Sequence, residues 1–279
     1  MKVNRDCEEC LWKRQQKLSD DPVYLSHIRK ILDSRRENDC APYLIYLFNK
    51  VYENRFGDRP DYSSEKKRYN DLILSLEESF TDRINSSDSP LKTALLYARV
   101  GNYIDFGALQ DVNERNLFEL FDHAKLSESD EIVYNSFINK CMQSKNFLLI
   151  ADNCGEIVLD KLFLIQLKSA FPQLQTTVMV RGGEALNDVT INDARYVRID
   201  QYARIITNGA AISGTVYELL SEEAKQIMNT SDIIFAKGQG NYESLSGQGF
   251  HIFYSFLCKC DLFINKFNVP KFTGMFLET

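Results

Sequence analysis

Histidine and tryptophan are scarce in this chain of 279 residues, which holds three His and one Trp. So few histidines, with none in a His-Glu spacing, disfavour a dedicated zinc hydrolase. No apolar run approaches the roughly 18 residues that a membrane-spanning helix needs. The first residues, Met1–Asp6, also lack the apolar core of a signal peptide. These absences predict a cytoplasmic protein without a membrane partner.

Positively charged residues are not in excess, and the number of cysteines is odd. The 33 Lys and Arg stand against 39 Asp and Glu, which gives a net charge of −6. A general nucleic-acid binder needs a basic face, so a nucleic-acid partner is disfavoured. Seven cysteines favour reduced thiols over a disulfide framework. The remaining composition, 44% hydrophobic and 26% charged, is that of a globular protein with material for one or two domains.

Apolar residues recur with a helical period over the first 84 residues, and no strand-like alternation interrupts them. The polar stretch 85–89, followed by Pro90, is the best linker and also a good helix start. We therefore predict a helical subdomain over 1–88 and a second domain over 89–279.

The period of the apolar residues changes from Asn146 onward, where short apolar runs alternate with helical patterns. Strands are predicted at 147–151, 176–180, 204–207, 233–236 and 252–257. Helices are predicted between the first four, at 155–170, 214–220 and 222–229. This alternation is typical of an α/β protein with a mostly parallel sheet and right-handed crossovers.

Polar residues and glycines follow four of the predicted strands. Asp152 and Asn153 end the first, Arg181 and Asp188 follow the second, Asn208 follows the third, and Lys237 ends the fourth. Because the carboxyl ends of parallel strands meet at one edge of the sheet, these residues are expected to converge. One such end alone is more often an ordinary turn, whereas four together favour a shared site.

The residue types at these strand ends suggest a cation beside an anion. Asp152, Asn153 and Asp188 offer the oxygen ligands that Mg²⁺ or Mn²⁺ takes in partial coordination. Lys237 is a point charge suited to a phosphate. The nearby glycines allow backbone N–H groups to approach an anion closely.

Three further motifs carry weaker alternatives. Gly238-x-Gly240 follows a strand as in a dinucleotide fingerprint, but Glu243 stands where the third glycine is needed, which disfavours a nucleotide cofactor. Cys7-x-x-Cys10 and Cys258-x-Cys260 would supply four thiolates to a metal, although buried cysteines acting as small hydrophobes are the favoured interpretation. Cys154 lies at a helix start, but no histidine is placed to activate it as a nucleophile.

With these motifs in hand, the chain resembles the metal-dependent damage-control phosphatases, formerly domain-of-unknown-function family 89, in their stand-alone microbial branch with an N-terminal Cys-x-x-Cys. The resemblance covers nearly the whole chain and rests on several motifs in order: Cys7–Cys10, Gly101–Phe106, Asp152–Glu156, Val180–Gly182, Asn187–Thr190, Asn208–Gly209, Lys237–Glu243 and Lys259–Cys260. Two departures are Cys154, where the family more often has Ala, and Glu184, where proline is common.

The resemblance implies a Rossmann-like three-layer α/β/α core with an N-terminal helical part. It also implies a divalent cation (Mg²⁺, Mn²⁺, Co²⁺ or Ni²⁺) held by Asp152, Asn153 and Asp188. Asn102, Asp105 and Lys237 would line the phosphate pocket. The other candidate substrate contacts in the matched motifs are Gly155, Glu156, Arg181, Asn208, Gly238 and Asn241.

We therefore predict a metal-dependent phosphomonoester hydrolase acting on small phosphorylated metabolites, such as sugar phosphates or damaged phosphometabolites. Asp152, Asp188 and Lys237 are the predicted catalytic residues, and either a carboxylate or a water that it orients would attack. The alternatives are a non-catalytic binder of phosphorylated ligands and a Rossmann-type methyltransferase. The methyltransferase is disfavoured because Asp152-Asn153 replaces the glycine-rich turn. The exact substrate and the oligomeric state stay open.

Overall fold

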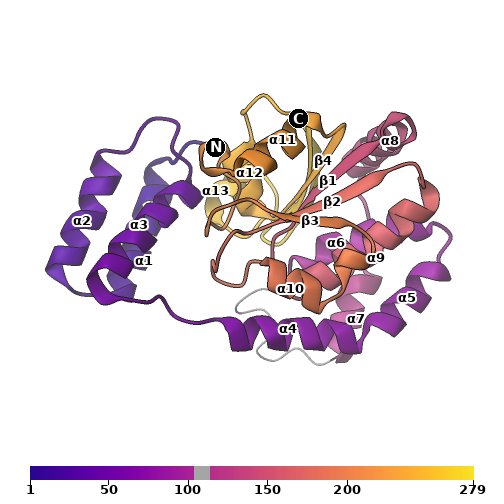
Figure 1. Cartoon of the computed structure of the whole chain (residues 1–279), viewed down its shortest axis with the longest axis horizontal. Coiled ribbons are helices and arrows are strands. Elements are labelled where there is room, and N and C mark those ends of the chain that lie inside the picture. Colours follow the sequence, from indigo (N-terminus) through magenta and orange to yellow (C-terminus); the bar gives the residue numbers. More distant parts are fainter. Residues whose placement is uncertain (104–113) are drawn as a thin grey trace.

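The first half of the chain is helical and the second half builds one sheet, as the computed structural model in Figure 1 shows. The structure describes residues 1–103 and 114–279. The first eight helices are α1 (Arg5–Leu18), α2 (Pro22–Asp33), α3 (Ala41–Phe56), α4 (Ser63–Ser75), α5 (Glu77–Asn85), α6 (Pro90–Gly101), α7 (Glu114–Asp122) and α8 (Glu128–Gln143).

Strands and helices then alternate. The strands are β1 (Asn146–Ile150), β2 (Gln175–Val180), β3 (Arg204–Thr207), β4 (Ile233–Lys237), β5 (Ile252–Leu257) and β6 (Gly274–Glu278). The helices between them are α9 (Glu156–Ala170), α10 (Ile191–Tyr196), η1 (Ile199–Gln201), η2 (Tyr217–Leu219), α11 (Glu222–Thr230), α12 (Gln239–Leu245) and α13 (Asp261–Phe267). Within the described residues, no helix is both long enough and apolar enough to cross a bilayer.

The six strands form one sheet in the order β3-β2-β1-β4-β5-β6. The first five strands are parallel, and β6 pairs antiparallel with β5. The predicted α/β class with a mostly parallel sheet is thereby confirmed. The antiparallel edge strand was not predicted, and the predicted helix over 214–220 is reduced to the single turn η2.

The central strands β1, β4 and β5 are buried on both faces, which explains why they read as largely apolar runs. Phe147 and Leu149 pack into a core that includes residues of α6, α8 and α9. Leu148 and Ile150, on the opposite face, pack with residues of α11, α12 and α13. The result is the predicted three-layer α/β/α arrangement.

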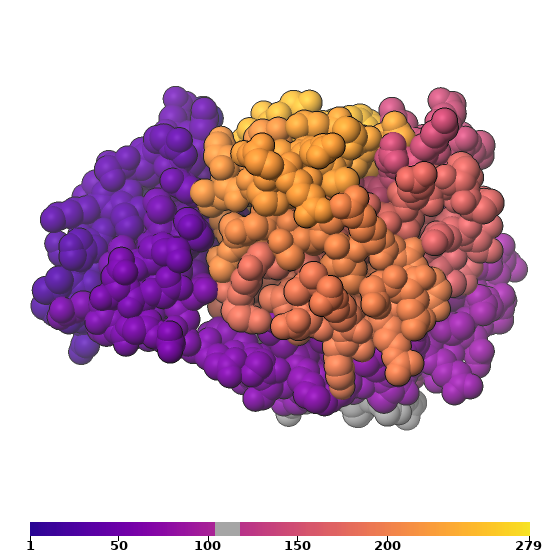
Figure 2. Space-filling model, in the orientation of Figure 1, coloured from indigo at the N-terminus to yellow at the C-terminus, as the bar shows by residue number. Residues whose placement is uncertain are grey.

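The helices before the sheet divide into two groups by their packing. Helices α1, α2 and α3 share a hydrophobic cluster of their own around Leu11, Ile28 and Leu44, and they form the indigo lobe beside the core in Figure 2. Residues of α4 and α5, such as Tyr69 and Phe80, instead belong to the core that includes the sheet. A domain boundary at 88 stays a prediction, although in hydrophobic packing the separate lobe ends with α3.

The strand order reverses direction at β1, because β2 lies on one side of it and β4 on the other. In open α/β sheets the crevice at the carboxyl ends of such neighbouring strands is where ligands bind. Asp152, Arg181 and Lys237 are the residues at or just after the ends of these three strands. The strand order therefore predicts a ligand site at the same edge of the sheet where the polar strand ends lie.

Candidate active site

The loops after β1 and β2 run side by side at this edge. Asn153 and Asp188 form an isolated antiparallel bridge. The amide of Val189 donates to the carbonyl of Asp152 (2.9 Å), and the amide of Cys154 donates to the carbonyl of Asn187 (2.8 Å). Backbone pairing therefore brings together the two segments that carry the three predicted metal ligands.

One buried arginine joins the two aspartates. Arg181 is 1% exposed, and its Nε lies 2.5 Å from Oδ2 of Asp188 while its Nη2 lies 3.4 Å from Oδ1 of Asp152. Its Nη1 donates to the carbonyl of Gly214 (3.0 Å) and to Oδ1 of Asn241 (3.1 Å). Arg181, predicted as a substrate contact, thus has these donors directed at protein acceptors and orients both carboxylates.

Two side-chain amides hold the other oxygen of Asp152. Asn102 Nδ2 donates to Oδ2 of Asp152 and to Oε2 of Glu156, both at 2.9 Å. Asn153 Nδ2 does the same, at 2.7 and 3.1 Å. Oδ1 of Asn102 also accepts from the amide of Leu257 (3.3 Å). The two amides therefore couple Asp152 to Glu156.

Lys237 lies behind Glu156 and is fully buried. Its Nζ donates to Oε1 of Glu156 (2.6 Å), to Oδ1 of Asp160 (2.7 Å) and to the carbonyl of Ala98 (2.9 Å). An ammonium has three protons, and these acceptors use all of them. Lys237 thus reaches Asp152 through Glu156 and the two amides, and its predicted contact with a phosphate stays a prediction.

Asp160 was not identified from the sequence. It lies four residues after Glu156 on α9, so the two carboxylates share one face of the helix. A charged residue inside the otherwise apolar start of α9 is the signal that would have found it, since a buried charge needs a partner. Oδ2 of Asp160 is buried with no hydrogen-bond partner in the described part of the protein.

Burial and negative neighbours shift the pKa values of these groups. Burial, together with the charges of Asp188 and Glu156, raises the pKa of Asp152 to about 8, and Arg181 and Lys259 oppose the rise. Burial also raises the pKa of Asp160 to about 7, against the opposing charge of Lys237. Several carboxylates in one buried site repel one another when they are ionised. Added positive charge, such as that of a cation, would stabilise their ionised forms.

This donor set fits a hard divalent cation. Asp152 and Asp188 supply carboxylate oxygens and Asn153 an amide oxygen, which are Mg²⁺- and Mn²⁺-type ligands. No group of three or more His, Cys, Asp or Glu side chains within residues 1–103 and 114–279 is arranged to hold a metal alone. A cation here would therefore complete its coordination with water and substrate, as Mg²⁺ commonly does.

The remaining predicted residues shape the loops. Gly155, with φ of +80°, precedes the first residue of α9. Asn208 Oδ1 accepts from the amides of Gly182 (2.8 Å) and Ala210 (2.9 Å). Asn241 Nδ2 donates to the carbonyls of Lys237 (2.6 Å) and Ala151 (3.3 Å).

Gly238, with φ of +78°, lies against Asp152, where an added Cβ would be 1.9 Å from Oδ2. Asp105 lies outside the described residues.

The cysteines behave differently from one another. Burial raises the pKa of Cys154, so its thiol is held protonated and is unsuited to nucleophilic attack. Burial also raises the pKa of Cys7 to about 12, with added effects of Glu243, Cys260 and Cys10. All seven cysteines are free thiols in the structure. Of the four cysteines in the two short motifs, Cys258 is buried, Cys7 and Cys260 are half-buried and Cys10 is exposed, so the small-hydrophobe and the metal-ligand interpretations both stay predictions.

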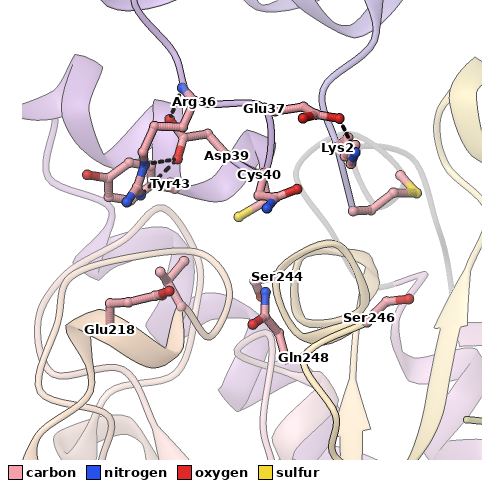
Figure 3. A pocket seen from close by; sticks show the side chains of 14 residues that line it. Lys2, Arg36, Glu37, Asp39, Cys40, Tyr43, Glu218, Ser244, Ser246 and Gln248 are labelled. Carbon is pink, nitrogen blue, oxygen red and sulfur yellow. Dashed lines mark hydrogen bonds and ion pairs between the residues drawn. The ribbon is translucent and has the colours of Figure 1, made fainter.

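A cavity of about 470 Å³ lies elsewhere, between the start of α3 and the end of α12. Figure 3 shows Cys40 and Tyr43 on one side of it and Ser244 and Gln248 on the other. Arg36 at its rim is paired with Asp39. None of the predicted site residues lines this cavity, so it is separate from the carboxylate cluster.

Comparison with known proteins identifies the family to which the chain is similar. Residues 3–273 match the family described as the damage-control phosphatase ARMT1-like domain. A protein of Archaeoglobus fulgidus named damage-control phosphatase is 30% identical over 256 residues, or 88% of each chain. A damage-control phosphatase of Pyrococcus horikoshii is 24% identical over 97% of this chain and 96% of its own.

A solved structure supports the fold as well. The crystal structure of a DUF89 family protein from Pyrococcus horikoshii matches with a TM-score of 0.82, covers 100% of this chain and 99% of its own, and is 24% identical in sequence. At that identity, the likeness concerns the fold alone.

Proposed function

Because the chain belongs to the family of damage-control phosphatase ARMT1-like domains, we propose that it is a phosphatase that hydrolyses small phosphorylated metabolites with a bound divalent cation. The observation that carries the proposal is the pair Asp152 and Asp188, which share the buried guanidinium of Arg181 beside β1. The names of the relatives support phosphate-ester chemistry at such a site.

Asp152, Asn153 and Asp188 are the residues that would hold the cation. When bound, the cation supplies positive charge that neutralises the charge developing on phosphoryl oxygens. At neutral pH an ionised Asp152, whose pKa is raised to about 8 by burial and by Asp188, depends on such added positive charge. Mg²⁺, Mn²⁺, Co²⁺ and Ni²⁺ are the candidates.

The protein's own residues would keep these ligands in place. Arg181 fixes one oxygen of each aspartate, and Asn102 and Asn153 fix the second oxygen of Asp152. Lys237 holds Glu156, which in turn orients both amides. A site held this rigidly places an attacking group in line with the phosphorus at little entropic cost. That group is either an aspartate or a water oriented by one.

We propose sugar phosphates and related damaged phosphometabolites as the substrate class. Asn102 and Asp105 are proposed on the phosphate side of the substrate, together with backbone N–H groups near Gly155 and Gly238. A direct contact between Lys237 and a phosphate oxygen would require Lys237 to exchange one of its three present acceptors.

The test is release of inorganic phosphate from a panel of sugar phosphates in the presence of each of the four cations. We expect EDTA to abolish release, metal to restore it, and Asp188→Ala to lower it by at least about 100-fold, as for loss of a group acting on transition-state charge. Asp200→Ala, at an exposed acidic residue of η1, is the matched control and retains activity. Turnover that survives both EDTA and Asp188→Ala rejects this mechanism.

A further inference from the structure

Helix α4 contacts both loops of the proposed site from outside the sheet. Lys66 and Asn70 lie four residues apart on this helix and so share one face. They are 2% and 1% exposed, which is unusual for a lysine and an asparagine unless each is paired. Each of the two side chains contacts a different loop.

Asn70 holds the loop that follows β1. Its Oδ1 accepts a hydrogen bond from the amide of Gly155 at 2.7 Å. Gly155 has a left-handed backbone with φ of +80°. The turn that carries Asp152 and Asn153 is thereby fixed at its far end by a residue 85 positions earlier in the chain.

Lys66 holds the loop that follows β2. Its Nζ lies 2.6 Å from Oε2 of Glu184 and 2.7 Å from Oδ2 of Asp193. Asp193 Oδ2 also accepts from the amide and the hydroxyl of Thr190, at 2.9 and 2.6 Å. Lys66 therefore ties together two points that flank Asp188.

A third contact comes from just before α4. Nη2 of Arg59 donates to the carbonyl of Glu184 at 2.8 Å. Glu184 is therefore held at two points, by Arg59 at its carbonyl and by Lys66 at its carboxylate.

We propose that Lys66 and Asn70 are positioning residues, which reinforce from outside the sheet the spacing that backbone pairing gives to the loop of Asp152 and Asn153 and the loop of Asp188. This inference rests on the proposed phosphatase function. A cation shared by ligands from two loops is sensitive to their spacing, since a misplacement of about 1 Å costs up to about 100-fold in rate. The contacts of Lys66 and Asn70 are with residues that flank Asp152 and Asp188 in the two loops.

The test compares variants that remove each contact with variants that keep it. Asn70→Leu removes the acceptor and Lys66→Met removes the charge, with little change in volume. Each is expected to lower kcat about 10- to 100-fold. Asn70→Asp and Lys66→Arg retain an acceptor and a charge, and they should recover kcat to within about threefold of the wild type. Lys67→Ala, whose side chain is 63% exposed on the same helix, is the control and keeps full activity.

Hydrogen exchange separates this inference from the function on which it rests. Asn70→Leu should speed amide exchange in 153–158 only, and Lys66→Met in 184–193 only, while the strands keep wild-type protection. Should either variant fail to fold, Glu184→Ala tests the Lys66 contact from its exposed partner, with the same local increase expected. No phosphate release by the wild type under any cation rejects the proposed function. A wild-type enzyme that is active, with kcat unchanged in both Asn70→Leu and Lys66→Met, overturns the positioning role.

Discussion

Side chains at this edge of the sheet are packed so closely that one added methyl group would displace a neighbour. The carboxylate of Asp152 is held by Asn102, Asn153 and Arg181, and the backbone of Gly238 lies against it. Gly238 also needs its left-handed backbone, with φ of +78°, which side chains other than glycine adopt at a cost. Both conditions permit glycine alone at this position.

We expect Gly238→Ala to lower the free energy of unfolding and to abolish phosphate release, because the new Cβ would displace Asp152. Gly247→Ala is the matched control, since Gly247 has a similar φ of +83° but nothing within 4 Å of an added Cβ. Backbone strain alone costs about 1–3 kcal/mol in each variant. Urea unfolding and activity assays measure both effects. Equal losses of stability and activity in the two variants would show that contact with Asp152 is unimportant.

The residue types in the sequence identified part of the candidate site. The remaining part depends on which charged side chains become buried, which the sequence does not show. Asp152, Asn153, Asp188 and Lys237 could be selected because polar residues follow several neighbouring parallel strands, whose carboxyl ends meet at one edge of the sheet. Their roles as metal ligands and phosphate contact stay predictions. The enclosure of Lys237 by Glu156 and Asp160 was not predictable, because sequence patterns do not show which charges lose their water on folding.

The secondary-structure elements were likewise predictable in part. The five parallel strands were predicted to within one residue at each end, helped by the largely apolar sequences of β1, β4 and β5, which are buried on both faces. Strand β6 was missed because its apolar run, Met275–Leu277, is short and only Phe276 in it is buried. The predicted helix over 214–220 fails at its start, where Gly214 has φ of +148° and its carbonyl accepts from Arg181.

Helix α8 is attached to the sheet through Phe137, which is fully buried and packs against several aromatic rings. Those rings are Phe147, Phe163, Phe235, Phe253 and Phe276. We expect Phe137→Ala to lower the free energy of unfolding by about 3–5 kcal/mol. Ile132→Ala, on the same helix but at a residue that is 72% exposed, should change it by less than about 0.5 kcal/mol. Denaturant titration measures both, and similar values would contradict this packing.

At the scale of the whole molecule, the protein has a sheet-centred core and a smaller lobe of α1, α2 and α3. The lobe has its own hydrophobic cluster, and a small cluster of Cys40, Ile212 and Val216 helps to join it to the core. A small cluster buries less apolar surface than the three-layer core, so its local stability is lower.

Native-state hydrogen exchange should therefore detect two levels of protection. Amides in 5–56 are expected to exchange through openings of lower free energy than amides of β1 and β4. Leu44→Ala, which removes a buried side chain of the lobe, should widen the difference by about 2–5 kcal/mol in the lobe alone. A uniform response across the whole chain would show that lobe and core unfold as one unit.

The contacts of α4 with the two loops of the proposed site also bear on how the molecule refolds. Lys66 and Glu184 are separated by 118 positions and Asn70 and Gly155 by 85, so each contact closes a long stretch of chain. Closing such long stretches of chain costs conformational entropy, so these contacts are expected to form late in folding. Circular dichroism reports helix content and does not report these contacts. A refolded sample with a normal spectrum is therefore best judged by its rate of phosphate release.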